Sequence, residues 1–170
     1  MSAHGKRYYG ERYRWMFYDP RKTAYFKEML VTVVGQALDA AGYTLEDSPL
    51  QQARGLLRYS KRLEGVVPIY GFIEWQLLAF EQSTLARFQI TLLRNQGHDA
   101  RAVTSYPERA ERTLSWIIWH IFEARILPAD DHWWVFRGEN DLPQALADAG
   151  RLLFGYGVPW LEMRDDVPDG

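Results

Sequence analysis

Hydrophobic residues recur at a spacing of three and four positions across residues 21–41. This spacing is typical of an amphipathic helix with one buried face. The apolar positions are Phe26, Met29, Leu30, Val33, Val34, Ala37, Leu38 and Ala41. Gly42 follows at the place where a residue with left-handed backbone commonly ends a helix. The pattern therefore predicts a helix over residues 21–41 that is capped by Gly42.

A second stretch with helical spacing lies farther along the sequence. Its apolar positions are Leu142, Ala145, Leu146, Ala149, Leu152 and Leu153. Asn140 or Asp141 can cap its first turn, because both side chains accept hydrogen bonds from free backbone N–H groups. We expect Gly155 or Gly157 to end this helix and Pro159 to stop it. The sequence thus predicts an N-terminal and a C-terminal amphipathic helix.

Between these helices, several segments have the composition and alternation of strands that bury one face. Residues 56–63 alternate in part, and residues 72–80 and 85–93 form two further β-rich runs. The short segment 82–84 predicts a turn that makes these two runs an antiparallel hairpin. A last short strand is expected at residues 133–136.

Residues 108–126 fit two interpretations. The spacing of Leu114, Ile117 and Ile118 fits a helix, whereas the density of tryptophan and isoleucine also suits a buried strand. We favour a helix that begins near Glu108 and gives way to extended chain near Arg125.

The order of these elements predicts an α+β fold. We expect an antiparallel sheet of about four to five strands, with the N-terminal and C-terminal amphipathic helices packed on one face. No internal repeat or low-complexity tract divides the chain, so residues 20–170 are expected to form a single domain. Residues 1–19 have no helical apolar stripe and are expected to form an arm.

The composition agrees with one folded domain. Hydrophobic side chains make up 47% and aromatic side chains 15% of the 170 residues, which is enough for one core. The sequence has no cysteine, which excludes disulfides, thiolate metal sites and a cysteine nucleophile. No secretory signal is recognised, and the most apolar run, residues 114–122, is far shorter than the ~20 residues of a membrane span. We therefore expect a soluble, cytoplasmic protein.

Charge is distributed unevenly along the chain. Residues 1–27 carry seven basic side chains against two acidic ones, although the whole protein has a net charge of −2. The arm interleaves its cations with aromatic rings, and its candidate binding residues are Arg12, Tyr13, Arg14 and Trp15. The arm could pack on the domain that follows, bind another protein, or stack on the bases of single-stranded nucleic acid while neutralising phosphates.

Four short motifs follow one another along the chain. They are Phe-Lys-Glu-Met-Leu at 26–30, Gly42 followed by Tyr43, the pair Trp133 and Trp134, and Gly-Val-Pro-Trp-Leu-Glu at 157–162. Together with the strand-rich middle, they resemble a family of bacterial domains catalogued as domain of unknown function 4304, over residues 25–162. The resemblance implies the fold and supplies no mechanism, because that family has no established activity.

One candidate chemical site lies in the apolar run. His120 and Glu123 are three positions apart, which would place them on one helical face, and Arg125 follows. An imidazole and a carboxylate at this spacing can bind one metal ion or act as a base and its orienting group. The alternative is a partly buried histidine that Glu123 or the backbone satisfies. No second histidine within a helical turn completes a metal site.

A second candidate lies just before the last strand. Asp130, Asp131 and His132 could coordinate a cation or hold a general base, although acidic residues also commonly cap such loops. Trp133 and Trp134 should point to opposite sides of a strand, so that one is buried and the other at least partly exposed. An exposed tryptophan can anchor a partner, or can simply be too large for complete burial.

These observations favour binding over chemistry. No nucleotide-binding loop and no serine-nucleophile motif is present in the sequence. We expect a non-catalytic protein-binding or accessory subunit of a bacterial complex, with defence and immunity complexes as candidates, that binds another protein or itself and uses no cofactor, metal or membrane. The alternatives are a small-molecule-binding or hydrolytic enzyme with a site near His120, Glu123 and Arg125, and single-stranded nucleic-acid binding through the arm.

Overall fold

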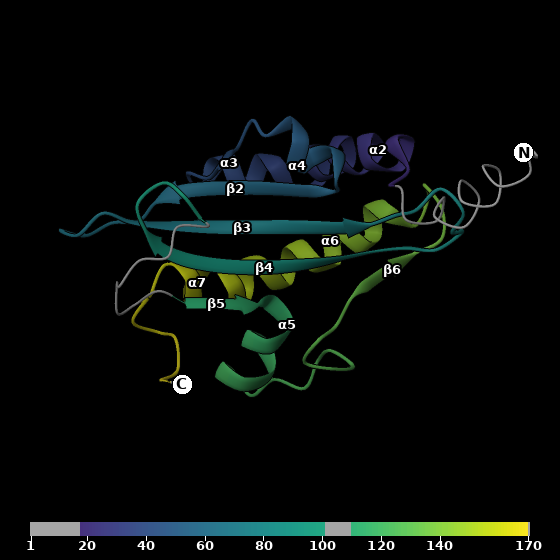
Figure 1. The fold of residues 1–170 in the computed structure, drawn as a ribbon. Helices are drawn as coiled ribbons and strands as arrows, with labels where there is room; N and C mark the ends of the chain where they lie inside the picture. Colours follow the sequence, from purple (N-terminus) through teal and green to yellow (C-terminus); the bar gives the residue numbers. More distant parts are fainter. Residues whose placement is uncertain (1–17, 101–109, 170) are drawn as a thin grey trace, which may run out of the picture.

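The computed structural model describes residues 18–100 and 110–169 (Figure 1). The helical elements are α2 (Pro20–Leu30), the π-helical turn η2 (Val31–Gly35), α3 (Gln36–Ala40), α4 (Pro49–Ala53), α5 (Leu114–Trp116), the π-helical turn η3 (Ile117–Ile121), α6 (Leu142–Leu152), the π-helical turn η4 (Leu153–Gly157) and α7 (Val158–Leu161). The strands are β1 (Thr44–Leu45), β2 (Leu56–Arg62), β3 (Ile69–Leu78), β4 (Ala86–Gln96), β5 (Ala110–Thr113) and β6 (Trp134–Phe136).

The strands form one antiparallel sheet. Five of them follow the order β1-β2-β3-β4-β5, and β6 also pairs with β4. β6 pairs with residues 86–88 of β4, whereas β5 pairs with residues 91–94. β5 and β6 therefore share one edge of β4, one after the other. The predicted α+β class with an antiparallel sheet is confirmed, and the two-residue β1 brings the sheet to 6 strands in the part of the chain that the structure describes.

The helices pack on one face of the sheet. Alternate side chains of the strands and the apolar sides of the helices form one core, whose members include Trp75, Leu77, Phe88, Ile90, Leu92, Phe26, Leu30, Val34, Leu146, Ala149 and Leu153. Figure 1 shows α6 passing behind β3 and β4, while no helix of the described residues covers the front of these strands. The expected packing of both amphipathic helices on one face is therefore confirmed.

The N-terminal helix begins and ends as its sequence predicts. The Asp19 side chain accepts a hydrogen bond from Arg21 N at 2.9 Å and caps the first turn. At the other end, Gly42 has a φ of 89°, and Tyr43 N donates to Leu38 O at 2.9 Å. The cap is thus the left-handed glycine that was expected. The π-helical turn η2 inside the helix was not predicted.

The C-terminal helix continues beyond its predicted end. Asp141 is at the N-cap, but η4 and α7 carry the helical path on to Leu161. Gly157 lies inside this path, where η4 meets α7, and a Cβ atom there would be 2.9 Å from Leu114 Cδ1 and would crowd the packing against α5. Pro159 is accommodated in the first turn of α7, where a missing N–H is tolerated. The expectation that the glycines and Pro159 end the helix is wrong.

The ambiguous segment contains both kinds of structure. Residues 110–113 form β5, and the helical path of α5 and η3 follows to Ile121. Thr113 separates the two, because its Oγ1 accepts a hydrogen bond from Trp116 N at 3.2 Å and caps the helix. The helix therefore begins later than the expected Glu108, after a short strand.

Candidate binding surfaces

The two neighbouring tryptophans have different environments, one in the core and one partly exposed, as strand alternation predicts. Trp134 is 7% exposed and stacks on Phe88 in the core, with 5.6 Å between the ring centroids. Trp133 is half-buried, and Arg87 Cζ lies 4.8 Å from the centroid of its ring. A guanidinium over an indole is an attractive cation–π arrangement. Trp133 is therefore the member of the pair that a partner can reach.

An apolar patch lies on the same side of the sheet as Trp133. Leu78, Arg87 and Val135 form one cross-strand row through β3, β4 and β6. Val135 is 57% exposed, and Leu85, which precedes β4, is 44% exposed. A hollow of about 300 Å³ lies among these side chains. We define the sheet-face patch by four apolar residues that line it, namely Leu78, Phe80, Leu85 and Val135.

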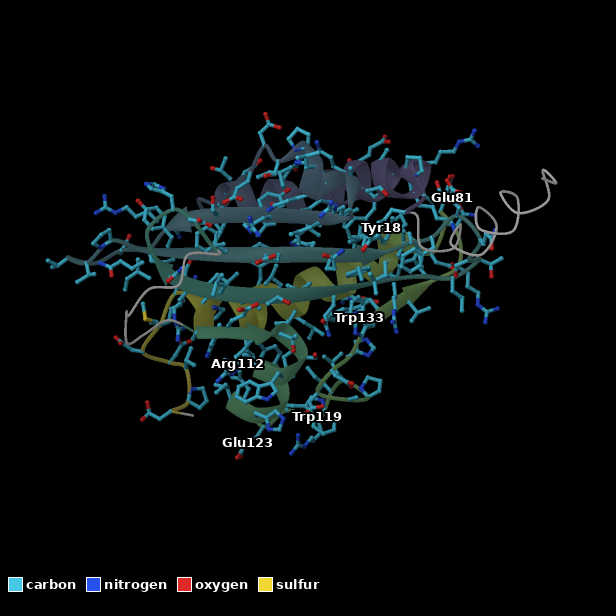
Figure 2. All side chains as sticks on the ribbon, in the orientation of Figure 1. Tyr18, Glu81, Arg112, Trp119, Glu123 and Trp133 are labelled. Atoms are coloured by element: carbon cyan, nitrogen blue, oxygen red, sulfur yellow. The ribbon has the colours of Figure 1, made fainter. Side chains whose placement is uncertain are left out.

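The end of the N-terminal arm reaches this patch. Tyr18 forms an antiparallel bridge with Phe80, and the centroids of their rings are 5.3 Å apart. Asp19 N donates to Ala79 O at 3.0 Å. Figure 2 shows Tyr18 at the same end of the sheet as Glu81. The chain therefore enters the domain beside the sheet-face patch. Outside the described residues lie Arg12, Tyr13, Arg14 and Trp15.

The candidate residues of the apolar run have separate environments. His120 Nε2 lies 2.8 Å from Asp130 Oδ2. Arg125 Cζ lies 4.2 Å from the centroid of the Trp119 ring, and Arg125 Nη1 donates to Trp119 O at 3.3 Å. Glu123 is exposed and has a φ of 52°. Within the described part of the chain, no hydrogen bond or ion pair joins any two of His120, Glu123 and Arg125.

The acidic loop before β6 contacts α5 and the core. Asp130 O accepts a hydrogen bond from Ser115 Oγ at 2.9 Å, in addition to the contact of its carboxylate. The rings of His132 and Trp134 are arranged edge to face, and their centroids are 4.8 Å apart. Burial lowers the pKa of His132, although the charge of Asp131 acts in the opposite direction. Among residues 18–100 and 110–169, no three His, Asp or Glu side chains are grouped so that they could hold a metal ion.

Within residues 18–100 and 110–169, four tryptophans each have an arginine over the ring. The pairs are Arg87 with Trp133, Arg94 with Trp160, Arg112 with Trp116, and Arg125 with Trp119, at 4.2–4.8 Å from Cζ to ring centroid. A stacked guanidinium keeps its N–H groups at its edge, where they can donate to a further acceptor. Sequence reasoning missed these pairs, and the available signal was an excess of arginine over lysine, 16 against 4.

Two of these pairs line a groove of about 650 Å³. The groove is bounded by β4, β5, the helical segment from α5 to Ile121, and residues 160–169. Its charged lining residues are Arg94, Arg112, Arg164, Asp165 and Asp169. We call this hollow the arginine groove, after its three arginines. Figure 2 shows Arg112, Trp119 and Glu123 below the sheet in this view, away from Tyr18. Sequence reasoning selected none of the lining residues as a site.

Beside the groove, Glu162 joins distant parts of the chain. Its Oε1 accepts hydrogen bonds from Tyr43 OH at 3.1 Å and Lys61 Nζ at 2.9 Å, and its Oε2 accepts one from Arg164 Nη2 at 2.8 Å. Burial alone would raise the pKa of Glu162, but the hydrogen bonds from these three partners outweigh burial and lower it. Burial, followed by the nearby carboxylate, raises the pKa of Tyr43, so its phenol stays protonated and donates.

Glu162→Gln is expected to remove part of the acid sensitivity of folding. Because the folded-state pKa of Glu162 is lowered, its carboxylate stabilises the fold above the ordinary value of 4.5, and this stabilisation is lost as the pH falls through the lowered pKa. The free energy of unfolding, measured with urea from neutral pH to about pH 3, should fall more steeply in the wild type than in the variant.

Glu64→Gln is the matched control for this titration. Glu64 is exposed and lines the same small hollow as Lys61 and Glu162. The control should keep the wild-type dependence on pH. Equal slopes for the wild type and Glu162→Gln would contradict the prediction.

No family model, curated protein or solved structure matches the chain. The resemblance to domain of unknown function 4304 therefore remains a prediction. In the two described stretches, no helix has the length and apolar character needed to cross a membrane.

Proposed function

We propose that the chain is a non-catalytic protein-binding or accessory subunit whose partner docks on the sheet-face patch. The supporting observation is that the patch lies between the last residues of the arm, Tyr18 and Asp19, and Trp133, which the sequence selected as a binding candidate. Tyr18 contacts Phe80 on one side of the patch, and Trp133 packs on Arg87 on the other. Exposed apolar side chains next to tryptophan and arginine have the composition of protein–protein interface cores.

The charges around the patch indicate the chemistry of the partner. Arg87 is exposed beside Val135, and Lys22 lies at the other side of the patch, where its Nζ donates to Phe80 O at 3.3 Å. A partner with apolar side chains surrounded by carboxylates would complement both features. We propose a different protein rather than a second copy, because two identical basic surfaces facing each other would repel.

We do not propose an active site at His120. Its side chain pairs with Asp130, and within the described residues no hydrogen bond or ion pair joins it to Glu123.

A photo-crosslinking amino acid at position 135 tests the docking surface. In the native host it is expected to give one discrete adduct with another protein. The same amino acid at position 66, which is 101% exposed in the turn between β2 and β3, should not give this adduct. Leu85→Asp should lower the yield by roughly tenfold or more, because a buried unpaired charge costs well over 1 kcal/mol.

Each other outcome of this experiment would count against the proposal. Identical adducts at positions 135 and 66, or no adduct at 135, would show that the sheet-face patch is not an interface. An adduct with a second copy of the chain would replace the proposed partner by self-association. An adduct with nucleic acid would instead favour the arm as a single-strand binding segment.

A further inference from the structure

The arginine groove is separate from the sheet-face patch. Arg94 lies near one end of β4, whereas Arg87 lies near the other end. Along this strand, Arg87 belongs to the uncovered side, while Arg94 packs against Trp160 from the helix layer. A ligand in the groove would therefore not compete with a protein on the patch.

Two tryptophans hold arginines of the groove in place. Arg94 Cζ lies 4.3 Å from the centroid of the Trp160 ring, and its Nη1 donates to Trp160 O at 2.6 Å. Arg112 Cζ lies 4.8 Å from the centroid of the Trp116 ring. Stacking restricts the rotation of these long side chains before any ligand arrives. Less conformational entropy is then lost on binding.

The exposed Arg112 has donors left for a ligand. In the described part of the chain its Nη1 donates to Glu111 O at 2.8 Å, which uses one of the five N–H groups of a guanidinium. Arg164, the third cation, is held by Glu162 through Nε and Nη2. Lys61 Nζ donates to the same carboxylate at 2.9 Å. Two positive charges therefore share the one negative charge of Glu162, which leaves a net positive charge at Arg164 and Lys61.

Two acidic side chains that line the arginine groove favour phosphate over carboxylate as the anionic group of the ligand. Asp165 and Asp169 line the groove together with the three arginines. Each carboxylate group of a ligand, however many the ligand has, carries only one negative charge and two acceptor oxygens, which these side chains already provide. A phosphate carries a charge of about −1.5 to −2 at neutral pH and three acceptor oxygens, so it can compete with them.

From this arrangement we propose that the arginine groove binds the phosphate group of a small phosphorylated ligand. A volume of about 650 Å³ lies within the range of small-molecule sites, roughly 300–1,000 Å³. The indole faces that carry Arg94 and Arg112 are already occupied, so these tryptophans position cations rather than stack on a base. The arginines therefore recognise the phosphate by its charge and by paired N–H donors of the guanidinium group. Asp165 and Asp169 compete weakly with the phosphate for the same arginines.

Isothermal titration calorimetry with pyrophosphate, ATP and citrate tests this proposal. Pyrophosphate and ATP should bind with dissociation constants in the micromolar range, below about 1 mM, and their affinity should fall as salt is added; citrate should bind more weakly than either. Arg112→Gln should weaken pyrophosphate binding by roughly tenfold or more, since one charge-assisted contact is lost. Arg137→Gln, an exposed arginine after β6, is the matched control and should bind as the wild type does.

A second variant makes the prediction two-sided. Asp165→Asn together with Asp169→Asn should tighten pyrophosphate binding, because two negative charges are removed from the groove. A variant that only disturbed the fold would weaken binding instead. Thermal unfolding checks that each variant is folded. The proposal is overturned if pyrophosphate gives no binding up to about 1 mM, if citrate binds more tightly, or if Arg112→Gln and Arg137→Gln behave alike.

Discussion

Phe88→Ala is expected to destabilise the protein by about 3–5 kcal/mol, the largest effect of any single truncation that we predict. Phe88 is fully buried on β4 and lies at the centre of an aromatic group. Its ring centroid is 5.5 to 6.3 Å from those of its neighbours, which are Phe26, Trp75, Trp134 and Phe136. Removing the ring leaves a cavity between the sheet and α2 that these large rings cannot fill, because they pack on other residues as well.

Urea unfolding followed by tryptophan fluorescence measures this loss. Phe88→Leu is the matched control, since it keeps most of the apolar volume and should cost only about 1–2 kcal/mol. A loss below about 1 kcal/mol for Phe88→Ala would mean that the centre of the core lies elsewhere.

Gly55→Ala is expected to destabilise the protein by about 2–5 kcal/mol, through two separate effects. Gly55 joins α4 to β2 with a φ of 77°, a conformation that side chains disfavour. A Cβ atom there would also lie 2.5 Å from Leu77 O, which is a backbone atom and cannot rotate away. The close approach is fixed by the hydrogen bond from Leu77 N to Gly55 O, at 2.8 Å.

Gly97→Ala separates the two effects. Gly97 has a φ of 90°, but a Cβ atom there would meet nothing within 4 Å. This variant should therefore show the conformational cost alone, about 1–2 kcal/mol. The free energies of unfolding of the two variants should differ by about 1–3 kcal/mol. Equal losses would show that β3 moves aside freely at Leu77.

The elements that local periodicity specifies could be predicted from the sequence. The helix over residues 21–41 and the hairpin of β3 and β4 depend on side chains spaced three to four, or two, positions apart, and that spacing can be read directly from the sequence. The same is true of Trp133 and Trp134, since neighbours in a strand must point to opposite sides.

Features that depend on contacts between distant segments could not be predicted. Gly157 resembles a helix-ending glycine, and only its packing against Leu114 shows that it belongs inside the helical path. The pairing of His120 with Asp130, instead of Glu123, depends on how the loop before β6 folds back. The arginine groove likewise forms from β4, β5, the helical segment after β5 and the residues after α7, and no single stretch of sequence contains its pattern.

The hydrogen bond between Tyr43 and Glu162 spans 119 positions of the sequence, and its span has a consequence for synthesis. In the described part of the chain, the six strands are all translated before α6 and α7. Until then, the side of the sheet that carries Leu77, Phe88 and Leu92 lacks part of its helical cover and stays in contact with water. The helical cover of this face can be complete only after α7 has been made, and a released chain that ends before residue 142 should present a strand-rich apolar surface of the kind that aggregates or recruits chaperones.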